Sequence, residues 1–548
     1  MTEPFATHDV FNQTPPFEDV NLFAIDTALR AGVARESAET TQDAFTVLSS
    51  LGQVAGSAQA ADWGRQANAM TPVLETHDAR GFRCDKVTFH PAYHELMRAS
   101  FAHGVHRLEE DTGTPHVMRA AKLYLAAQME AGHCCPLTMT NAAIPVLARA
   151  PELAALWGIK AAATVYDPSF RPVQDKDSVT FGMGMTEKQG GSDVRANTTR
   201  AEPDGARGAG QSYRITGHKW FMSAPMSDAF LVLAQAKGGL TCFLMPRFTP
   251  AGAINAIRFQ RLKSKLGNRS NASSEVEFHG AYAVALGEEG EGTRVIIDMV
   301  TLTRLDCAVS SAALMRQALA HAIHHAVHRT AFQKKLADQP LMAQVLAGLA
   351  IDVEAAVALV FRLARAFDTP GDPLSHAWRR LMTPVVKYWV CKTAPPFVAE
   401  AMECLGGNGY VEAGPLARIY REAPVNSIWE GSGNIMALDM VRVLRREPAL
   451  VRSLLDDQSV AIGSSALKGQ RDRVGALLRD EAHIEANARA ICEGLAVFAA
   501  GALLERDAPP EVAQGFIAMR CSGQPPGTYG ATRISEVRAI IGRALPVA

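Results

Sequence analysis

The spacing of apolar residues changes twice along this chain, and these two changes constrain the fold more than any other feature. Up to about residue 178 the apolar residues recur at helical spacing, as in TTQDAFTVLSSLGQVAGS. From Val179, short β-favouring segments such as SYRITGHKWFMS and AFLVLAQA lie between glycine, proline and asparagine turns. Helical spacing returns near Gly292, in runs such as VEAAVALVFRLARAF. This order predicts a mainly α fold with a central β domain.

The same changes divide the chain into four segments. We expect an N-terminal helical domain at 1–178, a middle β domain at 179–284 and a C-terminal helical bundle at 285–440. A helical extension at 441–548 completes the 548 residues, which are too many for one ordinary core. The extension has 14 Lys and Arg residues against 12 Asp and Glu residues, so its formal charge is +2, and 13 of the 14 are arginines.

Composition argues against several classes of protein. A net charge of −1 gives no global field that would draw the chain to nucleic acid or to an anionic membrane. The apolar stretches are shorter than the roughly 20 residues of a membrane span, and the acidic N-terminus lacks the apolar core of a signal peptide. The nine scattered cysteines form no C-x-x-C, which is typical of reduced thiols. We therefore expect a cytoplasmic protein with no membrane partner.

Two stretches of the β segment combine glycine, methionine and hydroxyl residues. In FGMGMTEKQGGSDV (181–194) the glycines would let a backbone approach a flat or phosphorylated ligand closely, and the Ser192 hydroxyl could bond to it. An ordinary turn before a strand explains the same residues. GHKWFMSAP (217–225) is typical either of a ligand-facing strand or of a core strand. Neither stretch is a Rossmann fingerprint or a P-loop.

The stretch from 405 to 436 holds a glycine-rich loop and a lone acid. Three glycines in LGGNGY permit a close-approach loop, and Arg418 and Arg421 could meet phosphates or pair with acids. Glu430 stands between Trp429 and Gly-Ser-Gly in NSIWEGSGNIM. A surface turn and a catalytic base beside a cofactor both account for it.

A metal site is not predicted. His321, His324, His325 and His328 recur at i, i+3, i+4 and i+7, which places them on one helix face. The sequence has no H-E-x-x-H and no nearby cysteine or carboxylate set to complete a ligand sphere. We interpret the stripe as a polar or interface face, and HCC at 133–135 as packing.

Taken in order, these stretches resemble the acyl-CoA dehydrogenase flavoprotein family over about residues 80–440. MTEKQGGSD is similar to the family's middle-domain motif, HKWFMS to its flavin-edge strand, and LGGNGY, RIYRE and IWEGSGN to its C-terminal motifs. GMGMTEKQGGSDV, NTTRAE, KLGNRSNAS and PVNSIWEGSGNIM resemble the AidB branch, the flavoproteins of the bacterial adaptive response to DNA alkylation, as does the helical extension. The resemblance implies a helical domain, a β-barrel-like middle domain and a four-helix bundle.

The resemblance implies FAD as cofactor and Glu430 as the catalytic base. In the family, a carboxylate removes the α-proton of an acyl thioester while the β-hydride goes to flavin N5. Glu430 matches the base of the medium-chain type, and desolvation beside Trp429 would strengthen it as a base. Other types place the base just before a helix arginine, where this chain has Thr303 before Arg304. Glu430 is the acid available at the two positions.

The FAD-binding residues that the resemblance implies come from these motifs and one helix end. They are Met183, Gly184, Met185, Thr186, Gly190, Gly191, Ser192, Phe221, Met222, Ser223, Arg329, Ile428, Trp429, Gly431, Ser432, Gly433 and Asn434. Ser223 matches a position near flavin N5 or O4. Arg329 matches the arginine that reaches a neighbouring subunit's FAD pyrophosphate, which implies a homotetramer.

Several positions depart from the family pattern. Gln333 replaces the glycine of a Phe-Gly pair, and Pro340 and Glu403 replace glutamines that contact FAD. A carboxylate near a pyrophosphate repels it unless a cation pairs with it. Trp429 is larger than the family's aromatic and would narrow the acyl tunnel.

Two functions follow from the resemblance. The first is an AidB-type flavoprotein that protects DNA from alkylation, binds double-stranded DNA through the extension and has weak isovaleryl-CoA-like dehydrogenase activity. A formal charge of +2 is small for a surface that binds DNA, although the four extensions of a tetramer would together make more phosphate contacts. The second is a metabolic dehydrogenase of short- or branched-chain acyl-CoA that uses Glu430. A flavin-holding tetramer without chemistry is a third interpretation.

Overall fold

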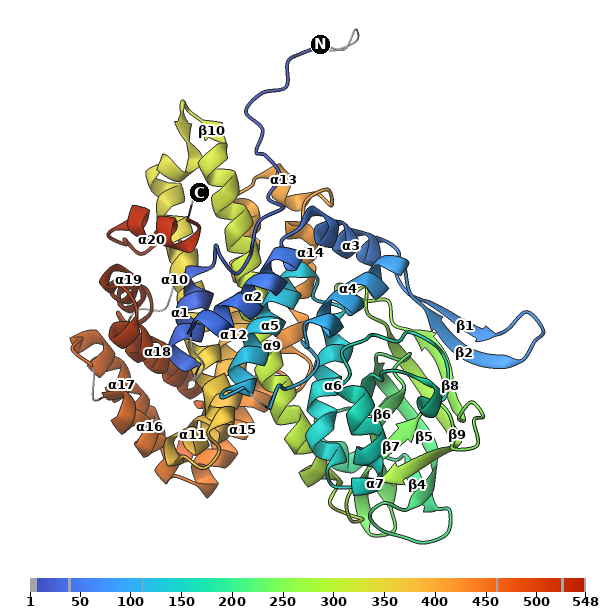
Figure 1. Ribbon diagram of the computed structural model, residues 1–548. Coiled ribbons are helices and arrows are strands. Elements are labelled where there is room, and N and C mark those ends of the chain that lie inside the picture. Colours follow the sequence, from blue (N-terminus) through green and yellow to red (C-terminus); the bar gives the residue numbers. More distant parts are fainter. Residues whose placement is uncertain (1–6, 38–40, 111, 460–461, 524–526, 547–548) are drawn as a thin grey trace. The chain divides into compact units, whose positions relative to one another are not determined.

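The computed structural model describes residues 7–37, 41–110, 112–459, 462–523 and 527–546 (Figure 1). The chain divides into two compact units, and each is assembled from separated segments. Unit 1 comprises residues 1–36, 311–427 and 436–548, and unit 2 comprises residues 37–310 and 428–435. The eight-residue segment that carries Glu430 therefore belongs to unit 2, although the chain on either side of it belongs to unit 1.

Unit 2 begins with helices and a small hairpin. Its helices are α2 (Thr41–Ala55), α3 (Ala58–Ala69), α4 (Pro91–Ala102), α5 (Pro115–Met129), α6 (Cys134–Leu147), α7 (Pro151–Leu153) and α8 (Ile159–Ala161). Strands β1 (Val73–His77) and β2 (Arg83–Thr88) pair antiparallel between α3 and α4. The Ser57 side chain caps α3 by accepting a hydrogen bond from Ala60 N at 3.1 Å.

A seven-stranded sheet follows, and it is drawn mainly in green in Figure 1. Its strands are β3 (Phe181–Gly184), β4 (Arg200–Pro203), β5 (Ser212–Ser223), β6 (Ala229–Ala236), β7 (Gly239–Pro246), β8 (Ile257–Leu262) and β9 (Ser273–Ala285). The order is β3-β5-β4-β6-β7-β9-β8, and further pairings between β3 and β6 and between β5 and β9 close the sheet on itself.

Both faces of this sheet are apolar because its strands alternate between two buried clusters. On β6, Phe230 belongs to a cluster with Tyr213, Met222 and Phe259. Its neighbour Leu231 belongs to another cluster, which includes Met139 of α6. Successive side chains of a strand point to opposite faces, so one strand serves both clusters.

Unit 1 is helical. Besides α1 (Thr27–Glu36) and the last part of α9 (Gly292–His328), it contains the short strands β10 (Thr330–Ala331) and β11 (Lys334–Lys335). Its other helices are α10 (Pro340–Asp368), α11 (Pro373–Ala377), α12 (Thr383–Glu403), α13 (Gly407–Tyr410), α14 (Leu416–Glu422), most of α15 (Gly433–Arg446), α16 (Ala449–Ser459), α17 (Ser465–Arg479), α18 (Ala488–Asp507), α19 (Pro510–Arg520) and α20 (Val537–Ala544).

Helix α10 is the core helix of unit 1. It contacts α1, α12, α18, α19 and α20. Among the described residues it is the helix long and apolar enough to cross a membrane, but 89% of that apolar window is buried inside the fold. Core helices have the same composition, so its apolar character is explained by packing.

Buried ion pairs join the C-terminal extension to α10. Asp352 on α10 has no exposed surface and accepts hydrogen bonds from the Arg520 guanidinium and, at 2.7 Å, from the Tyr529 hydroxyl. Glu354 accepts a hydrogen bond from Arg543 Nε at 2.7 Å. The prediction of a mainly α fold with a central β domain and a helical extension is confirmed.

Candidate active site

Two of the predicted FAD-binding stretches lie side by side in the sheet. Gly184 of β3 pairs with Met222 of β5 in antiparallel register. Beyond this pair, Trp220 N donates a hydrogen bond to the Thr186 carbonyl at 2.8 Å. The turn that begins at Met185 therefore meets the end of β5, as a shared binding site requires.

A buried ion pair fastens the two stretches together. Lys219 Nζ lies 2.9 Å from Glu187 Oε1, and both side chains have no exposed surface. Glu187 also accepts hydrogen bonds from Thr198 N at 2.7 Å and Thr199 N at 3.1 Å. Burial alone would raise the pKa of Glu187, but the Lys219 ammonium and these hydrogen bonds outweigh it and hold the pKa well below its ordinary value.

Gly190 and Gly191 of the turn are glycines for different structural reasons. Gly190 has φ of +144°, and a Cβ built on it would meet no atom within 4 Å, so its backbone faces open space. A Cβ on Gly191 would stand 2.2 Å from the Thr186 hydroxyl, so only glycine fits there. The turn explanation accounts for Gly191 and for the two backbone hydrogen bonds between Gly190 and Glu187, and the space beside Gly190 leaves room for a ligand.

The end of β5 presents alternate residues to alternate faces. Met222 is fully buried in the sheet's core cluster. Phe221 is 49% exposed, which is unusual for a phenylalanine in a long strand. Ser223 is half-buried. Of the three predicted residues, Phe221 and Ser223 therefore offer side chains to a ligand, and Met222 offers only its backbone.

Residues 428–435 complete the site within unit 2. Trp429 packs against the apolar cluster that includes Met183 and Cys135. Glu430 has φ of +58°, a left-handed conformation that is strained for a residue with a side chain, and Gly431 follows at +108°. Arg304 Nε donates a hydrogen bond to the Glu430 carbonyl at 3.1 Å. The backbone is thus fixed at the position of the predicted base.

A thiol lies in this site. Burial raises the pKa of the Cys135 thiol to about 11, and the negative charge of Glu430 adds to the increase. The Lys265 ammonium and hydrogen bonds from Asn271 and Ser223 act in the opposite direction. Ser223 therefore lies within hydrogen-bonding reach of the Cys135 thiol, and Glu430 lies close enough for its charge to act on that thiol. The interpretation of HCC at 133–135 as packing is confirmed by the burial of all three residues and by the place of Cys135 in a core cluster. No local pattern in the sequence indicates that the charge of Glu430 acts on Cys135.

The segment that carries Lys265 and Asn271 is held by a second buried carboxylate. Glu130 accepts hydrogen bonds from Ser270 Oγ at 2.9 Å and from His133 N at 2.8 Å. A Cβ on Gly132 would stand 2.0 Å from Ser270 Oγ, so this approach depends on glycine. Glu130 thereby connects the start of α6, which carries Cys135, to the segment that contacts it.

Arg329 belongs to unit 1, whereas the residues above belong to unit 2. Its Nη1 donates a hydrogen bond to the Asn12 carbonyl at 2.5 Å. Phe332 and Gln333 form the two-residue turn between β10 and β11, both with positive φ. Arg421 pairs with Glu412, which fits the acid-pairing alternative for that arginine. The role of Arg329 toward a neighbouring subunit's FAD stays a prediction.

The histidine stripe of α9 receives the N-terminal segment of the chain. His324 Nε2 lies 2.9 Å from the Pro15 carbonyl, Thr14 Oγ1 lies 2.9 Å from His325 Nδ1, and Phe17 packs edge-on to His321. Within the described part of the chain, no group of three or more His, Cys, Asp or Glu residues could hold a metal ion.

Similarity to known proteins identifies the family. Residues 12–168 match the family described as the adaptive response protein AidB N-terminal domain. Residues 182–281 and 290–445 match the middle and C-terminal domains of acyl-CoA dehydrogenase. The chain is 48% identical to AidB of Escherichia coli (strain K12), an acyl-CoA dehydrogenase by name, over 97% of this chain and 96% of that one. The chain belongs to the acyl-CoA dehydrogenase family.

Other proteins resemble the chain over most of its length. It is 31% identical to acyl-CoA dehydrogenase family member 11 of Caenorhabditis elegans, over 80% of this chain and 76% of that one. The crystal structure of C. elegans ACDH-11 in complex with C11-CoA has a TM-score of 0.85 at 28% identity, covering 95% of this chain and 94% of that one. The apo-form of Bd2924 has a TM-score of 0.83 at 26% identity, covering 91% and 100%.

Family membership confirms the predicted enzyme class and cofactor. Acyl-CoA dehydrogenases are oxidoreductases that use FAD, and the predicted flavin motifs lie inside the matched middle and C-terminal domains. The residues that bind FAD in this chain stay predictions.

Proposed function

We propose that this protein is an AidB-type flavoprotein that takes part in protecting DNA from alkylation and retains an acyl-CoA dehydrogenase site with Glu430 as its base. The observation that carries the proposal is the placement of Glu430. Its strained backbone is held by Arg304, and its charge acts on the Cys135 thiol that Ser223 contacts. A surface turn would need none of these contacts.

The residues at this site fit FAD. Phe221 and Ile428 leave large apolar side chains 49% and 62% exposed, and a flat ring system would cover such surface. The half-buried Ser223 adds a hydroxyl group that can form a hydrogen bond, and the open space beside Gly190 leaves room for a ligand. We propose that Met185, Thr186, Gly190, Phe221 and Ser223 hold the isoalloxazine ring. When bound, FAD supplies the hydride acceptor.

The remaining chemistry belongs to side chains of the chain. Glu430 takes up the α-proton of an acyl thioester on its carboxylate, and Arg304 fixes the backbone that aims this carboxylate. Trp429 packs into the apolar cluster beside Glu430 and excludes water from it. The same bulk narrows the space for an acyl chain, so we propose weak turnover and a preference for short, branched acyl groups such as isovaleryl.

An anaerobic bleaching experiment tests this proposal. Protein loaded with FAD is mixed with isovaleryl-CoA without oxygen, and the flavin absorbance is followed in the wild type, Glu430→Gln and the control Glu202→Gln, which changes an exposed glutamate of β4. We expect bleaching in the wild type and in Glu202→Gln, and slower bleaching, by a factor of about 1000 or more, in Glu430→Gln. FAD content should be equal in all three.

Two results would contradict this proposal. Equal bleaching in the wild type and Glu430→Gln would remove Glu430 from the base role. Fast turnover, at rates typical of metabolic enzymes (about 10 per second), would favour the alternative, a metabolic short- or branched-chain acyl-CoA dehydrogenase. The ACDH-11 relative was solved with C11-CoA, which supports an acyl-CoA ligand under either alternative but not a preference for short acyl chains.

We further propose that the extension binds double-stranded DNA and that the protein is a cytoplasmic homotetramer. Arg445, Arg446 and Arg452 support DNA binding, because they are exposed and no hydrogen bond or ion pair to their side chains is found among the described residues. All nine cysteines are free thiols, which supports a reducing compartment. In a tetramer, four copies of this arginine cluster would act together on one duplex.

A further inference from the structure

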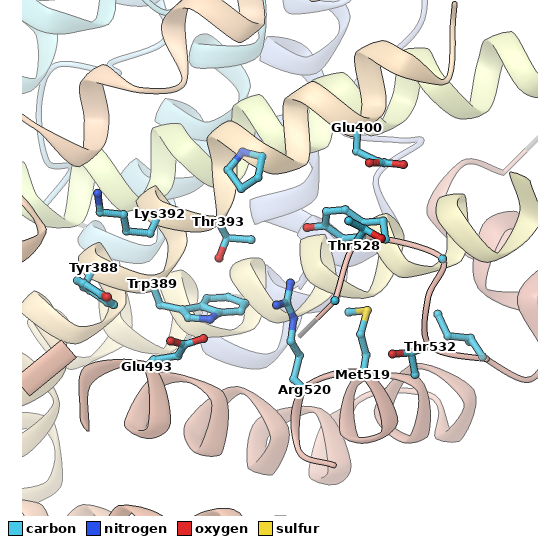
Figure 2. Close-up of a pocket in the computed structure, with 15 residues that line it drawn as sticks. Tyr388, Trp389, Lys392, Thr393, Glu400, Glu493, Met519, Arg520, Thr528 and Thr532 are labelled. Atoms are coloured by element: carbon cyan, nitrogen blue, oxygen red, sulfur yellow. The ribbon is translucent and has the colours of Figure 1, made fainter. Parts of the chain in front are cut away.

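A pocket lies in unit 1, between α12 and the helical extension. It has a volume of about 520 Å³, the size of a small-molecule site. One wall is a face of α12, and the others are α18, the end of α19 and residues 527–534 (Figure 2). The flavin motifs contribute no residue to it.

The pocket is built on fixed elements. Arg520 at its centre is bound to the buried Asp352, and Tyr529 donates a hydrogen bond to the same carboxylate. Gln344 holds Ile534 through two hydrogen bonds, from Gln344 Nε2 to the Ile534 carbonyl at 2.9 Å and from Ile534 N to Gln344 Oε1 at 2.8 Å. The segment that closes the pocket is therefore anchored at two points, and a ligand need not order it.

The lining is aromatic and apolar with scattered hydroxyl groups. Tyr388 and Trp389 stand at one end, and Met519 lies toward the other end (Figure 2). Ile534 also lines the pocket. Thr393, Thr528 and Thr532 add hydroxyl groups that can donate and accept hydrogen bonds. A planar ring with polar edge atoms meets both kinds of lining, whereas a simple acyl chain would leave the hydroxyl groups unused.

The charges around the pocket sum to one negative charge. Lys392, Arg520 and the Arg489 that lies over the Tyr388 ring are positive, and Glu400, Glu493, the Asp352 behind Arg520 and the Glu403 beside Glu400 are negative. The carboxylate of Asp352 already neutralises the charge of the Arg520 guanidinium. Among the described residues, no hydrogen bond or ion pair is found for the side chains of Lys392, Glu400 or Glu493. Burial raises the pKa of Glu400, and the negative charge of Glu403, one turn away on α12, raises it further. A phosphate would be repelled here, and a single positive charge would be attracted.

We propose that this pocket binds a planar heteroaromatic ligand of nucleoside size that carries one positive charge. Aromatic walls attract such a cation, and the carboxylates of Glu493 and Glu400 match its charge. Arg520 and Tyr529 form the fixed floor against which the ring packs. The proposal concerns a site separate from the flavin site and does not depend on acyl-CoA chemistry.

Three adenosine derivatives that differ chiefly in charge test the proposal. FAD-loaded full-length protein is titrated calorimetrically with 1-methyladenosine, which is a cation, with neutral adenosine, and with anionic adenosine 5′-monophosphate. FAD saturation keeps these probes out of the flavin site. We expect 1-methyladenosine to bind most tightly and the monophosphate most weakly. Tightest binding by the monophosphate, or no binding of 1-methyladenosine at millimolar concentration, would overturn the proposal.

Matched variants locate the binding. Glu493→Gln removes an exposed lining carboxylate and should weaken 1-methyladenosine binding about fivefold while leaving adenosine binding nearly unchanged. Glu485→Gln removes an exposed carboxylate outside the pocket and should change neither. Thr393→Phe fills the pocket and should abolish binding of all three probes while the FAD content stays constant. Equal effects of Glu493→Gln and Glu485→Gln, or full binding by Thr393→Phe, would place the ligand elsewhere.

Discussion

Lys219 and Glu187 show how single residues build the flavin site without touching a ligand. Both are fully buried, and each lies inside one of the stretches that the resemblance assigned to FAD. A buried ion pair is no assurance of stability, since removing both charges from water costs about as much as their attraction returns. Its value here is positional, because it joins the turn after β3 to the end of β5.

Breaking this pair should be costly. Lys219→Met leaves the Glu187 carboxylate buried without its cation, so we expect the free energy of unfolding to fall by about 3–5 kcal/mol. Lys188→Met, which changes an exposed lysine in the same stretch, should cost less than about 0.5 kcal/mol. Urea unfolding of the two variants and the wild type measures both values.

The effect of Lys219→Met should also depend on pH. The pKa of Glu187 is held below its ordinary value of 4.5, so the stability that this provides is present above pH 4.5 and declines as the pH falls further. The gap in unfolding free energy between the wild type and Lys219→Met should therefore narrow in acid. A gap that stays constant from neutral pH into acid would show that the pair does not act through the charge of Glu187.

At the scale of elements, the N-terminal segment lies along α9 and covers its histidine stripe. Phe17 packs on His321 and His324, and Thr14 contacts His325. Burial lowers the pKa of His321 to about 3, and the neighbouring positive charges of His324 and Arg418 act in the same direction. The interface role that the spacing predicted is met within the chain itself.

Low pH should lower the free energy of unfolding through His321 of α9. Above pH 6.5 the ring of His321 is neutral in both the folded and unfolded chain, so it carries no penalty. Between pH 6.5 and about 3, the unfolded chain takes up a proton and the folded chain does not, so this group removes up to about 1.4 kcal/mol of stability for each pH unit. His321→Gln should make the decrease in stability between about pH 7.5 and about pH 5.5 smaller, as urea unfolding measures.

His279→Gln is the matched control, because His279 is an exposed histidine of β9 with 60% of its side chain accessible. It should leave the pH dependence of unfolding unchanged. Identical pH dependence in His321→Gln and the wild type would show that His321 is accessible to protons in the folded protein.

The sequence predicted the elements well because helices and strands leave local periods of 3.6 and 2 residues. It also predicted that MTEKQGGSD and HKWFMS belong to one site, although only through resemblance. Contacts between distant residues left no such signal. In the sequence, Arg304 mattered only because Thr303 precedes it where other types of the family have their base. Its hydrogen bond to the Glu430 carbonyl joins residues 126 positions apart, which no local pattern indicates. Cys135 was correctly interpreted as packing, but its hydrogen bonds with Asn271 and Ser223 form only in the folded chain and left no local signal.

At the scale of the whole molecule, the arginines of the extension have different tasks. Arg520 and Arg543 form ion pairs with Asp352 and Glu354 of α10, so they stabilise the fold. Arg445, Arg446 and Arg452 are exposed near the end of α15 and the start of α16. A net charge of +2 for the extension conceals this division, because the paired arginines contribute to the sum but not to the free surface.

DNA binding should depend on the exposed group. The triple variant Arg445→Gln, Arg446→Gln, Arg452→Gln should weaken binding to a fluorescent DNA duplex and lower the slope of log affinity against log salt by about 0.9 for each phosphate that the protein no longer neutralises. Fluorescence anisotropy between about 50 and about 200 mM salt measures this slope. The double variant Arg65→Gln, Arg98→Gln, which changes exposed arginines of unit 2, is the control. An unchanged slope in the triple variant would exclude these arginines from the DNA interface.

Because the two units are built from alternating segments of the chain, the ribosome cannot finish unit 2 before it has made a large part of unit 1. Residues 37–310 of unit 2 are made directly after residues 1–36 of unit 1, yet the segment 428–435 follows only after residues 311–427 of unit 1 have been made. Domains fold as units during translation, with N-terminal parts first. A nascent chain that stops before residue 428 therefore holds the flavin-side turn and strand without Glu430. The growing polypeptide acquires its base late, when most of both units has already been translated.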